Sequence, residues 1–380
     1  MKKEENGLRL TKEDFKGLKK GGAPFQNEDL WSFLKSDSRP IFLYGTGNGG
    51  DKIVDALERF GIPLTGVFAS PGFERDRTFR GFKVESYGAV RERYGDEITV
   101  LLAFGTDRKT VWDFIKELDS RHLLLIPDVP LYGGELFTAE YARKNEAPIR
   151  RAGSLFHDPV SKALYDAVVR FRLTGCAEYL ATVEEPEKSY YDAFGEDISR
   201  ICDLGAYKGD SALMFGRTFP RLSEVIAFEA DGRSFKKLCE TAEATEYPRI
   251  TPHNCALSDE CGETVFVSSA SRGSGVSGKN RRSKTVTVQK RTLDSFRLQN
   301  IDLIKFDVEG DETAALKGAE KTVLRCRPSL AVSLYHRTDD FFALPLFIKD
   351  FLDENGIEAK FFLRRPPCVP MWDVTLFVKM

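Results

Sequence analysis

Two acidic residues that close apolar runs are the residues in this chain best suited to do chemistry. Asp203 closes one run and leads through Gly205 and Gly209 into an amphipathic segment, and Glu229 closes the next run. Glycines permit a tight turn close to a ligand, and parallel sheets bind ligands at the carboxyl ends of their strands. The pattern predicts a site for a nucleotide-type ligand, in which Glu229 accepts from both ribose hydroxyls. Alone, Glu229 could equally be a solvated acid at a strand end.

A second acidic cluster lies farther along the chain, where another apolar run ends. Lys305 and Asp307 project from the same face of this predicted strand, because side chains alternate along a strand, and Glu309 follows in the turn. We predict site roles for Asp307 and Glu309. Asp311 and Glu312 open the next predicted helix, where the helix macrodipole favours acids, and we attribute them to that effect.

Polar residues after two other predicted strands complete the set of candidate site residues. Ser258 and Asp259 are placed to accept a hydrogen bond from the exocyclic amine of adenine, and the alternative is a plain polar turn. His336 is a candidate general base, because imidazole exchanges protons near neutral pH. A lone histidine is also common as a structural residue.

An earlier glycine-rich loop, Gly45-Thr-Gly-Asn-Gly-Gly50, matches the pattern G-x-G-x-x-G between a predicted strand and a predicted helix. Such loops bind the phosphates of a dinucleotide at the helix N-terminus. The companion acid about 20 residues farther on is missing, because the next strand runs into Ala69-Ser70-Pro71. The loop indicates a Rossmann-like unit without a dinucleotide, or with another nucleotide or sugar nucleotide, rather than NAD chemistry.

Alternating strand and helix patterns must hold these residues in place. In the first half, we predict strands at 41–44, 64–68, 98–104 and 123–126 and helices at 51–60 and 108–118. In the second half, we predict strands at 199–204, 224–229, 250–257, 263–268, 284–290, 302–307, 329–335, 358–364 and 373–379 and helices at 210–218, 233–243, 311–324 and 341–354. This alternation implies parallel sheets with right-handed crossovers, and the prolines between the last two strands indicate an antiparallel terminal pair.

The predicted fold class is therefore α/β, with two Rossmann-like domains. We divide the chain into a polar and helical N-terminal segment 1–37, a Rossmann-like domain 38–150, a helical connector 151–197 and a second domain 198–380. One low-complexity segment, 268–283, is rich in Ser, Gly and basic residues. It would form either a solvated hairpin tip or a cover over an anionic acceptor.

The composition excludes several classes of protein. Lys plus Arg number 56 against 58 for Asp plus Glu, so no global charge favours nucleic acid or an anionic membrane. No apolar stretch approaches the roughly 18 residues of a membrane span, and the first residues lack an apolar signal core. The seven cysteines are scattered, which is typical of reduced thiols in the cytosol, and the four histidines are isolated. We expect a cytoplasmic protein without a histidine-based metal cluster.

Seven short motifs occur in the same order as in a known enzyme family. They are Asp203–Gly209, Phe228–Ala230, Asn254–Asp259, Thr292–Phe296, Ile304–Glu312, Leu316–Gly318 and Arg327–Pro328. Through them the chain resembles the FkbM family of S-adenosyl-L-methionine (SAM)-dependent methyltransferases, from about residue 190 to residue 336. The resemblance implies that the second domain is a class I methyltransferase sheet with a closing antiparallel strand pair.

The same resemblance implies the ligand and the roles of its contacts. SAM would be bound by Asp203, Gly205, Ala206, Gly209, Glu229, Ala230, Ser258 and Asp259. Members of the family typically O-methylate hydroxyls, often on sugars of glycans and glycolipids or on polyketides. The chain departs from the family in two places: the loop carries a large Tyr207 where Asn is frequent, and the acid that often precedes the histidine equivalent to His336 is absent.

The predicted mechanism is in-line methyl transfer to a hydroxyl that a nearby base helps to ionise. The candidate catalytic residues are Lys305, Asp307, Glu309 and His336. Asp307, Glu309 and His336 could also bind a divalent cation, but no clear third carboxylate stands with them, so no metal site is predicted.

The leading hypothesis is thus a SAM-dependent O-methyltransferase of a saccharide or a similar hydroxyl-bearing small molecule, without nucleic acid or a transmembrane segment. The first domain would present the acceptor or mediate assembly, and homo-oligomers stay open. Two alternatives remain: an NAD-binding enzyme that modifies nucleotide sugars, and a non-catalytic nucleotide-binding scaffold.

Overall fold

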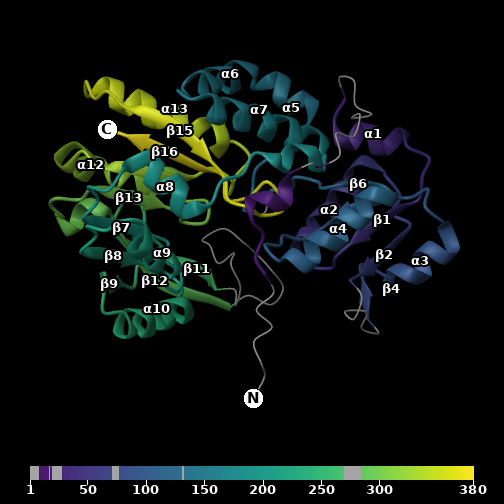
Figure 1. Ribbon diagram of the computed structural model, residues 1–380, viewed down its shortest axis with the longest axis horizontal. Coiled ribbons are helices and arrows are strands. Elements are labelled where there is room, and N and C mark those ends of the chain that lie inside the picture. Colours follow the sequence, from purple (N-terminus) through teal and green to yellow (C-terminus); the bar gives the residue numbers. More distant parts are fainter. Residues whose placement is uncertain (1–7, 17, 19–27, 71–76, 131, 269–283) are drawn as a thin grey trace.

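The computed structural model describes residues 8–16, 18, 28–70, 77–130, 132–268 and 284–380. Two α/β units lie side by side, with a layer of helices joining them along one edge of the molecule (Figure 1). None of the helices in the described part of the chain has the length and apolar composition needed to cross a bilayer. The predicted basic segment lies, apart from Ser268, outside the described residues.

The first unit is a six-stranded sheet in the order β3-β4-β2-β1-β5-β6. Its strands are β1 (Ile41–Tyr44), β2 (Gly66–Ala69), β3 (Thr78–Phe79), β4 (Phe82–Ser86), β5 (Thr99–Leu102) and β6 (Leu123–Leu125). Its helical segments are η1 (Lys12–Phe15), α1 (Leu30–Ser36), α2 (Asn48–Phe60), α3 (Tyr87–Tyr94) and α4 (Lys109–Arg121). All neighbours except the short β3–β4 pair are parallel, which gives the Rossmann-like order predicted for this part of the chain.

A helical layer follows the first unit. It comprises α5 (Ala139–Lys144), α6 (Glu146–Ser154), α7 (Pro159–Thr174), η2 (Ala177–Ala181) and α8 (Pro186–Phe194). Helix α7 is sharply delimited: Asp158 caps it by accepting from the N–H of Ser161, Pro159 occupies its first position, and Gly175 ends it in the left-handed conformation.

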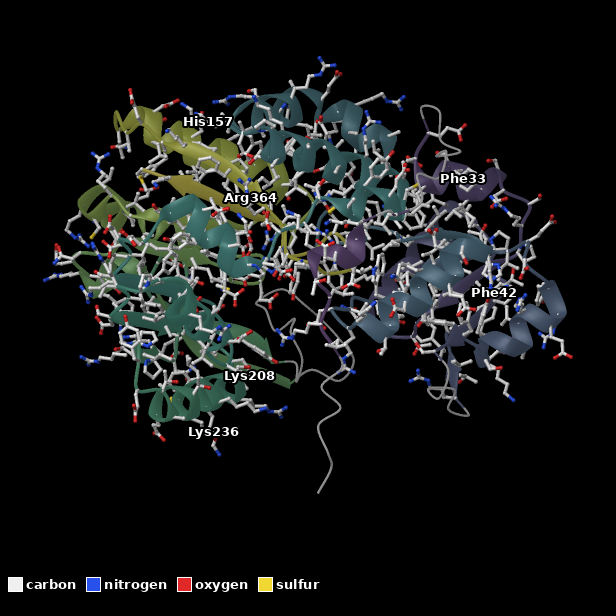
Figure 2. All side chains as sticks on the ribbon, viewed as in Figure 1. Phe33, Phe42, His157, Lys208, Lys236 and Arg364 are labelled. Carbon is white, nitrogen blue, oxygen red and sulfur yellow. The ribbon has the colours of Figure 1, made fainter. Side chains whose placement is uncertain are left out.

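The helical layer is attached to the second unit by direct contacts. Helix α6 packs on α13 (Asp340–Glu354), and α7 packs on β15 (Lys360–Arg364). His157, labelled in Figure 2, lies at this junction, where its backbone N–H donates to the carbonyl oxygen of Phe361 at 3.2 Å. The predicted boundaries between the first domain, the connector and the second domain stay a proposal. Helix α6 runs across the boundary that is predicted at residue 150.

The second unit is a seven-stranded sheet in the order β15-β16-β14-β13-β7-β8-β9. Its strands are β7 (Arg200–Leu204), β8 (Glu224–Phe228), β9 (Arg249–His253), β13 (Leu303–Phe306), β14 (Ser329–Ser333), β15 and β16 (Thr375–Lys379). Its helical segments are α9 (Asp210–Thr218), α10 (Gly232–Ala244), η3 (Leu293–Phe296), α11 (Glu312–Lys317), α12 (Glu320–Cys326) and α13.

Strand directions in the second sheet confirm the predicted fold class. Strands β9, β8, β7, β13 and β14 are parallel, whereas β16 runs antiparallel to both β14 and β15. This is the predicted closing antiparallel pair. A separate three-stranded sheet is formed by β10 (Ala256–Leu257), β11 (Gly262–Ser268) and β12 (Lys284–Arg291).

Two predicted elements are wrong because each is divided in the structure. The single strand expected at 250–257 is β9 and β10, which belong to different sheets. Between them, the side chain of Asn254 turns back to donate to the carbonyl oxygen of Glu229 at 2.8 Å. The single helix expected at 311–324 is α11 and α12, because Asp294 accepts from the backbone N–H groups of Lys321 and Thr322 and so caps a new helix.

The two units also share a hydrophobic core. One continuous cluster of buried residues includes Tyr44 of the first sheet, Phe171 of helix α7 and Leu376 of the second sheet. Backbone hydrogen bonds link Thr106, after β5, with Val369 near the end of the chain, in both directions, at 2.7 and 3.0 Å. The first unit is therefore held against the loop between β15 and β16.

Candidate functional site

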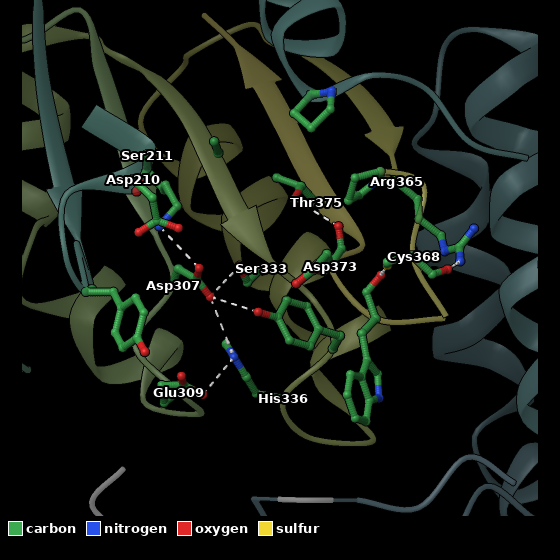
Figure 3. A pocket seen from close by; sticks show the side chains of 18 of the residues that line it. Asp210, Ser211, Asp307, Glu309, Ser333, His336, Arg365, Cys368, Asp373 and Thr375 are labelled. Carbon is green, nitrogen blue, oxygen red and sulfur yellow. Dashed lines mark hydrogen bonds and ion pairs between the residues drawn. The ribbon is translucent and has the colours of Figure 1, made fainter. Parts of the chain in front are cut away.

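A cavity of about 1080 Å³ lies at the carboxyl ends of the second sheet, where the first unit faces it. The second unit contributes the ends of strands β7, β8, β13 and β14 and the loop between β15 and β16. The first unit contributes residues 105–107, 128–130 and Tyr132. Figure 3 shows this wall, with Asp307, Glu309 and His336 grouped on one side and Arg365, Cys368 and Asp373 on the other.

The glycine loop after β7 is shaped by the chain around it. Gly205 has a φ of +83°, and a Cβ at this position would lie 1.9 Å from the carbonyl oxygen of Asp307. Gly209 has a φ of +90°, and its Cβ would lie 3.0 Å from the side chain of Thr241. Tyr207 between them also has a positive φ of 51°. Close packing against β13 and α10 already requires glycine at these two positions. The sequence argument that a ligand requires them is therefore incomplete.

Glu229 follows β8 and lies on the cavity wall, 8% exposed. Its Oε2 accepts from the backbone N–H of Tyr207 at 2.8 Å, and its Oε1 accepts from the N–H of Asp231 at 2.7 Å. Burial raises the pKa of the Glu229 carboxyl to about 7, although the two N–H groups act in the opposite direction. These two hydrogen bonds fix the Glu229 carboxyl group beside the glycine loop.

Lys305 links the two strands that meet beneath the cavity. Its Nζ lies 3.1 Å from Asp203 Oδ1 and 3.2 Å from Asp307 Oδ2. Burial disfavours the charged amine, but the two carboxylates outweigh burial and raise the pKa of Lys305. Burial likewise works against the ionised Asp307, but Lys305 and His336 outweigh it and hold the pKa of Asp307 below its ordinary value.

His336 lies behind these carboxylates and is fully buried. Its Nδ1 is 2.8 Å from Glu312 Oε1, and its Nε2 is 3.3 Å from Glu309 Oε2 and 3.6 Å from Asp307 Oδ1. Burial disfavours the charged imidazole, but the carboxylates, above all Glu312, outweigh it and raise the pKa of His336 well above its ordinary value. Glu312 opens helix α11 as predicted, but it is also fully buried against His336, a contact that the helix macrodipole does not explain.

Hydroxyl groups complete the surroundings of Asp307. Its Oδ1 accepts from Ser333 at 2.9 Å and from Tyr335 at 3.2 Å (Figure 3). The ring of Tyr132, from the first unit, stands edge-on to His336 with the ring centres 5.1 Å apart. The second unit alone therefore does not complete the cavity wall around the histidine.

The structure brings many but not all of the predicted site residues to the cavity wall. Those on the wall are Lys305, Asp307, Glu309, His336, Gly205, Glu229 and Ala230. Asp203 and Ala206 are buried, Asp203 beneath Lys305, and Gly209 begins helix α9. Ser258 and Asp259 follow β10 and do not line the cavity. The two residues of β10 itself, Ala256 and Leu257, do line it. Their role as contacts of an adenine ring stays a prediction.

Sequence reasoning missed several residues of the site. Tyr132, Tyr335, Asp210, Asp231 and Asp373 line the cavity. Asp210 and Asp231 lie next to the predicted motifs, so that their position at the start of a helix was a usable signal. Tyr132 and Asp373 come from distant segments and carried no local signal.

Packing also explains the first glycine loop. A Cβ on Gly45 would lie 2.5 Å from the ring of Phe104, and one on Gly49 would lie 2.5 Å from the carbonyl oxygen of Ala103. At the end of β2, where a dinucleotide site needs an acid, the hydroxyl of Ser70 instead pairs with that of Tyr44 at 2.5 Å. Nothing in this geometry requires a dinucleotide.

Comparison with known proteins identifies the second unit. Residues 203–358 match the model of the methyltransferase FkbM domain. This match begins at Asp203 and includes Glu229, Lys305 and His336. No curated protein sequence matches the chain.

One solved structure matches the fold over most of the chain. A methyltransferase FkbM from Methylobacillus flagellatus is 19% identical, with a TM-score of 0.65 over 93% of this chain and 94% of that one. An rRNA methylase from Streptococcus thermophilus is 13% identical, with a TM-score of 0.33 over 52% of this chain and 97% of that one. Fibrillarin from Aeropyrum pernix, solved with bound SAM, is 14% identical, with a TM-score of 0.31 over 47% of this chain and 66% of that one. The first match covers both units and shows that they share its overall arrangement.

Proposed function

We propose that this chain, whose residues 203–358 are an FkbM methyltransferase domain, is a SAM-dependent O-methyltransferase. The acceptor that we propose is a hydroxyl of a saccharide or of a glycan or glycolipid precursor. The observation that carries the proposal is the position of Glu229, whose fixed carboxyl lies on the cavity wall beside the glycine loop of this domain.

The residues around Glu229 fit SAM in chemistry and in size. A carboxylate offers about four lone-pair sites, and two backbone N–H groups occupy only two of those on Glu229. Two sites are left for the vicinal hydroxyls of a ribose. The cavity volume of about 1080 Å³ lies at the upper end of the roughly 300–1,000 Å³ typical of small-ligand pockets, which suits a cofactor together with an acceptor.

The charge of the wall suits a cationic cofactor. Glu229, Asp231, Asp210 and Asp307 line the cavity near the glycine loop, and the ammonium group of Lys305 is already paired with two carboxylates. When bound, SAM supplies a methyl group on a positively charged sulfur, ready for transfer. We propose that Glu229 and the loop at Gly205 hold it, with Ala230 and Leu257 beside the adenine ring.

The acceptor hydroxyl must lose its proton as its oxygen gains the methyl group. We assign the proton-accepting role to Glu309 or Asp307 rather than to His336. The imidazole of His336 has no exposed surface from which to reach an acceptor, and both of its nitrogens already face carboxylates. The two acids are similarly exposed, at 27% for Asp307 and 29% for Glu309, but Lys305 and His336 hold the pKa of Asp307 below its ordinary value and so make Asp307 the weaker base. Glu309 is therefore the favoured base.

A saccharide acceptor agrees with the rest of the wall. Carboxylates and hydroxyls such as Asp373, Tyr335 and Tyr132 line the space opposite the glycine loop, and such groups bind sugar hydroxyls. The excess of acids would repel the phosphates of nucleic acid, which we therefore do not propose as an acceptor.

All seven cysteines are free thiols, which supports the proposed location in the cytoplasm. A homo-oligomer remains a proposal without a specific surface.

Calorimetric titration of the full-length protein with SAM, S-adenosylhomocysteine and NAD tests the cofactor. We expect SAM and its demethylated product to bind and NAD not to bind. Glu229→Ala should weaken SAM at least tenfold, because a ribose then loses its acceptors (about 1.4 kcal/mol or more). Incubation with methyl-labelled SAM and a panel of saccharides then tests transfer.

The matched control is Gly47→Ala in the first glycine loop. A Cβ on Gly47 meets no atom within 4 Å and its φ is −94°, so this variant should fold normally. It should bind SAM as the unsubstituted protein does. Tight NAD binding without SAM binding would contradict the proposal, and equal loss in both variants would place the ligand in the wrong domain.

A further inference from the structure

We propose that His336, Asp307 and Glu309 bind a divalent cation at the base of the cavity, with Glu312 orienting the histidine. From sequence, the pair Asp307 and Glu309 lacked a third carboxylate. The fold adds a third, Glu312, on the opposite ring nitrogen of the histidine, and ligand atoms of Asp307, Glu312 and His336 all lie within 4.8 Å of one another. The short segment 307–312 thus meets His336, which lies 24 positions beyond Glu312.

The Nε2 atom of His336 is the observation that points to a ligand. The side chain has no exposed surface, yet Nε2 has no aligned hydrogen-bond partner. It faces the gap between Glu309 and Asp307, as the dashed lines in Figure 3 show. A buried polar atom without a partner destabilises the folded protein. A cation placed between these three groups removes that cost.

Glu312 holds the imidazole in the orientation that a metal ligand needs. Its Oε1 lies 2.8 Å from His336 Nδ1 and also accepts from the backbone N–H of Val308 at 2.9 Å, and its Oε2 accepts from Gly310 at 3.1 Å. When the ring is neutral and Nδ1–H is donated to Glu312, the lone pair of Nε2 points toward Asp307 and Glu309, where a cation takes the place of the Nε2 proton. Metal-binding histidines almost always have such a partner on the opposite nitrogen.

The distances between the ligand atoms are those that one small cation requires. Atoms bonded at about 2.1 Å to one ion stand about 3.0 Å apart at right angles and about 3.4 Å apart at tetrahedral angles. The separations from Nε2 are 3.3 Å to Glu309 and 3.6 Å to Asp307. Asp307 keeps Oδ2 for Lys305, and the hydroxyls of Ser333 and Tyr335 support Oδ1 in the way that ligating carboxylates are commonly supported.

The balance of charge also favours a cation. Asp307, Glu309 and Glu312 place three carboxylates around the imidazole, against a single ammonium group on Lys305. A divalent ion offsets the remaining negative charge, which is costly to bury alone. A donor set of one imidazole and two carboxylates suits Mn²⁺ or Zn²⁺ better than Ca²⁺.

The role of this cation rests on the proposed methyl transfer, although the site itself does not. Glu309 and Asp307 line the cavity, so the open positions of the ion would face an acceptor. A cation held by Asp307, Glu309 and His336 would make a nearby acceptor hydroxyl more acidic. The proton would pass to a neighbouring carboxylate or to water, the oxygen would bond to the methyl carbon, and the S–CH3 bond of SAM would break to release S-adenosylhomocysteine.

Mn²⁺ is the probe that tests the site, with full-length protein freed of metal by a chelator and then dialysed. We expect one Mn²⁺ per chain by calorimetry and by electron paramagnetic resonance, with ¹⁴N modulation from His336 in the pulsed spectrum. Glu309→Gln, which changes a partly exposed side chain and should fold, is expected to weaken Mn²⁺ at least tenfold. Asp339→Asn is the matched control, because Asp339 is an exposed carboxylate three residues from His336 and should leave Mn²⁺ binding unchanged.

Each outcome decides between the two proposals. A protein that binds SAM but not Mn²⁺, or that binds Mn²⁺ without ¹⁴N modulation, overturns the cation site and leaves the methyltransferase intact. A protein that binds Mn²⁺ but not SAM overturns the proposed cofactor and leaves the cation site. Equal Mn²⁺ binding by Glu309→Gln and Asp339→Asn also overturns the site.

Discussion

The carbonyl oxygen of Asp307 lies 1.9 Å from the point where a Cβ on Gly205 would stand. The glycine loop after β7 and the end of β13 are thus in direct backbone contact, with no room for a side chain between them. This contact joins the wall that carries Glu229 to the wall that carries Glu309. Gly205 sets the spacing between the two walls.

Replacement of Gly205 by Ala is expected to destabilise the protein. The added Cβ meets backbone atoms and the φ of +83° strains any residue other than glycine, at a cost of about 1–3 kcal/mol for the conformation alone. Urea unfolding measures the loss. Gly232→Ala is the control, because its Cβ meets no atom within 4 Å at the start of α10, and it should be neutral or slightly stabilising.

The affinity for S-adenosylhomocysteine is expected to rise as the pH increases through about 7. Burial raises the pKa of Glu229 to about 7, so below that pH the carboxyl is protonated in the free protein. Ribose hydroxyls donate best to the ionised form, so binding selects this form and releases a proton. Below pH 7 the affinity should fall by up to about tenfold per pH unit.

Calorimetry in two buffers of different ionisation enthalpy checks this proton release. We expect close to one proton released at pH 6 and almost none at pH 8.5. Glu229→Ala should show no release at either pH. A pH-independent affinity in the unsubstituted protein would mean that Glu229 does not contact the ligand.

Removal of the charge on Lys305 is expected to be strongly destabilising. In Lys305→Met, the fully buried carboxylate of Asp203 and the partly exposed carboxylate of Asp307 lose their shared cation, and such a change at a buried ion pair costs about 3–5 kcal/mol. The double variant Asp203→Asn/Lys305→Met should recover part of the loss. Arg91→Ala, which breaks an exposed ion pair with Asp96, should leave the stability nearly unchanged in the same urea assay.

Arg365→Lys is expected to loosen the loop between β15 and β16. The buried guanidinium donates to the carbonyl oxygens of Leu180, Cys368 and Pro370, and one ammonium group cannot reproduce that fork. We expect thermal unfolding to show a loss of about 1.5–3 kcal/mol. Arg121→Lys on exposed helix α4 should change stability by less than about 0.5 kcal/mol, and an equal effect of both would contradict this role for Arg365.

Local pattern was sufficient for most of the fold. Buried runs such as Ile41–Tyr44 could only be strands of a parallel sheet, and the alternation with amphipathic segments determined the layers. It failed at 250–257 and 311–324, where the chain changes sheets or starts a second helix. Both breaks depend on partners elsewhere in the chain, namely Glu229 for the first and Asp294 for the second.

The same division holds for the candidate site. Asp307, Glu309 and Glu229 follow strands whose carboxyl ends meet at one edge of the sheet, so their proximity could be predicted. The buried state of Glu312 could not, because an acid in a first helical turn is normally explained by the helix macrodipole.

The sequence by itself determined the α/β fold class, the resemblance of the second unit to an FkbM methyltransferase domain and the edge of the sheet at which the acids gather, because strand periodicity and motif order are local properties. Only the tertiary structure decided that Asp203 lies beneath Lys305, that Glu312 meets His336, and that Tyr132 from the first unit stands over the histidine. These contacts join segments far apart in the chain, and burial, which no local pattern records, determines their charge and their chemistry.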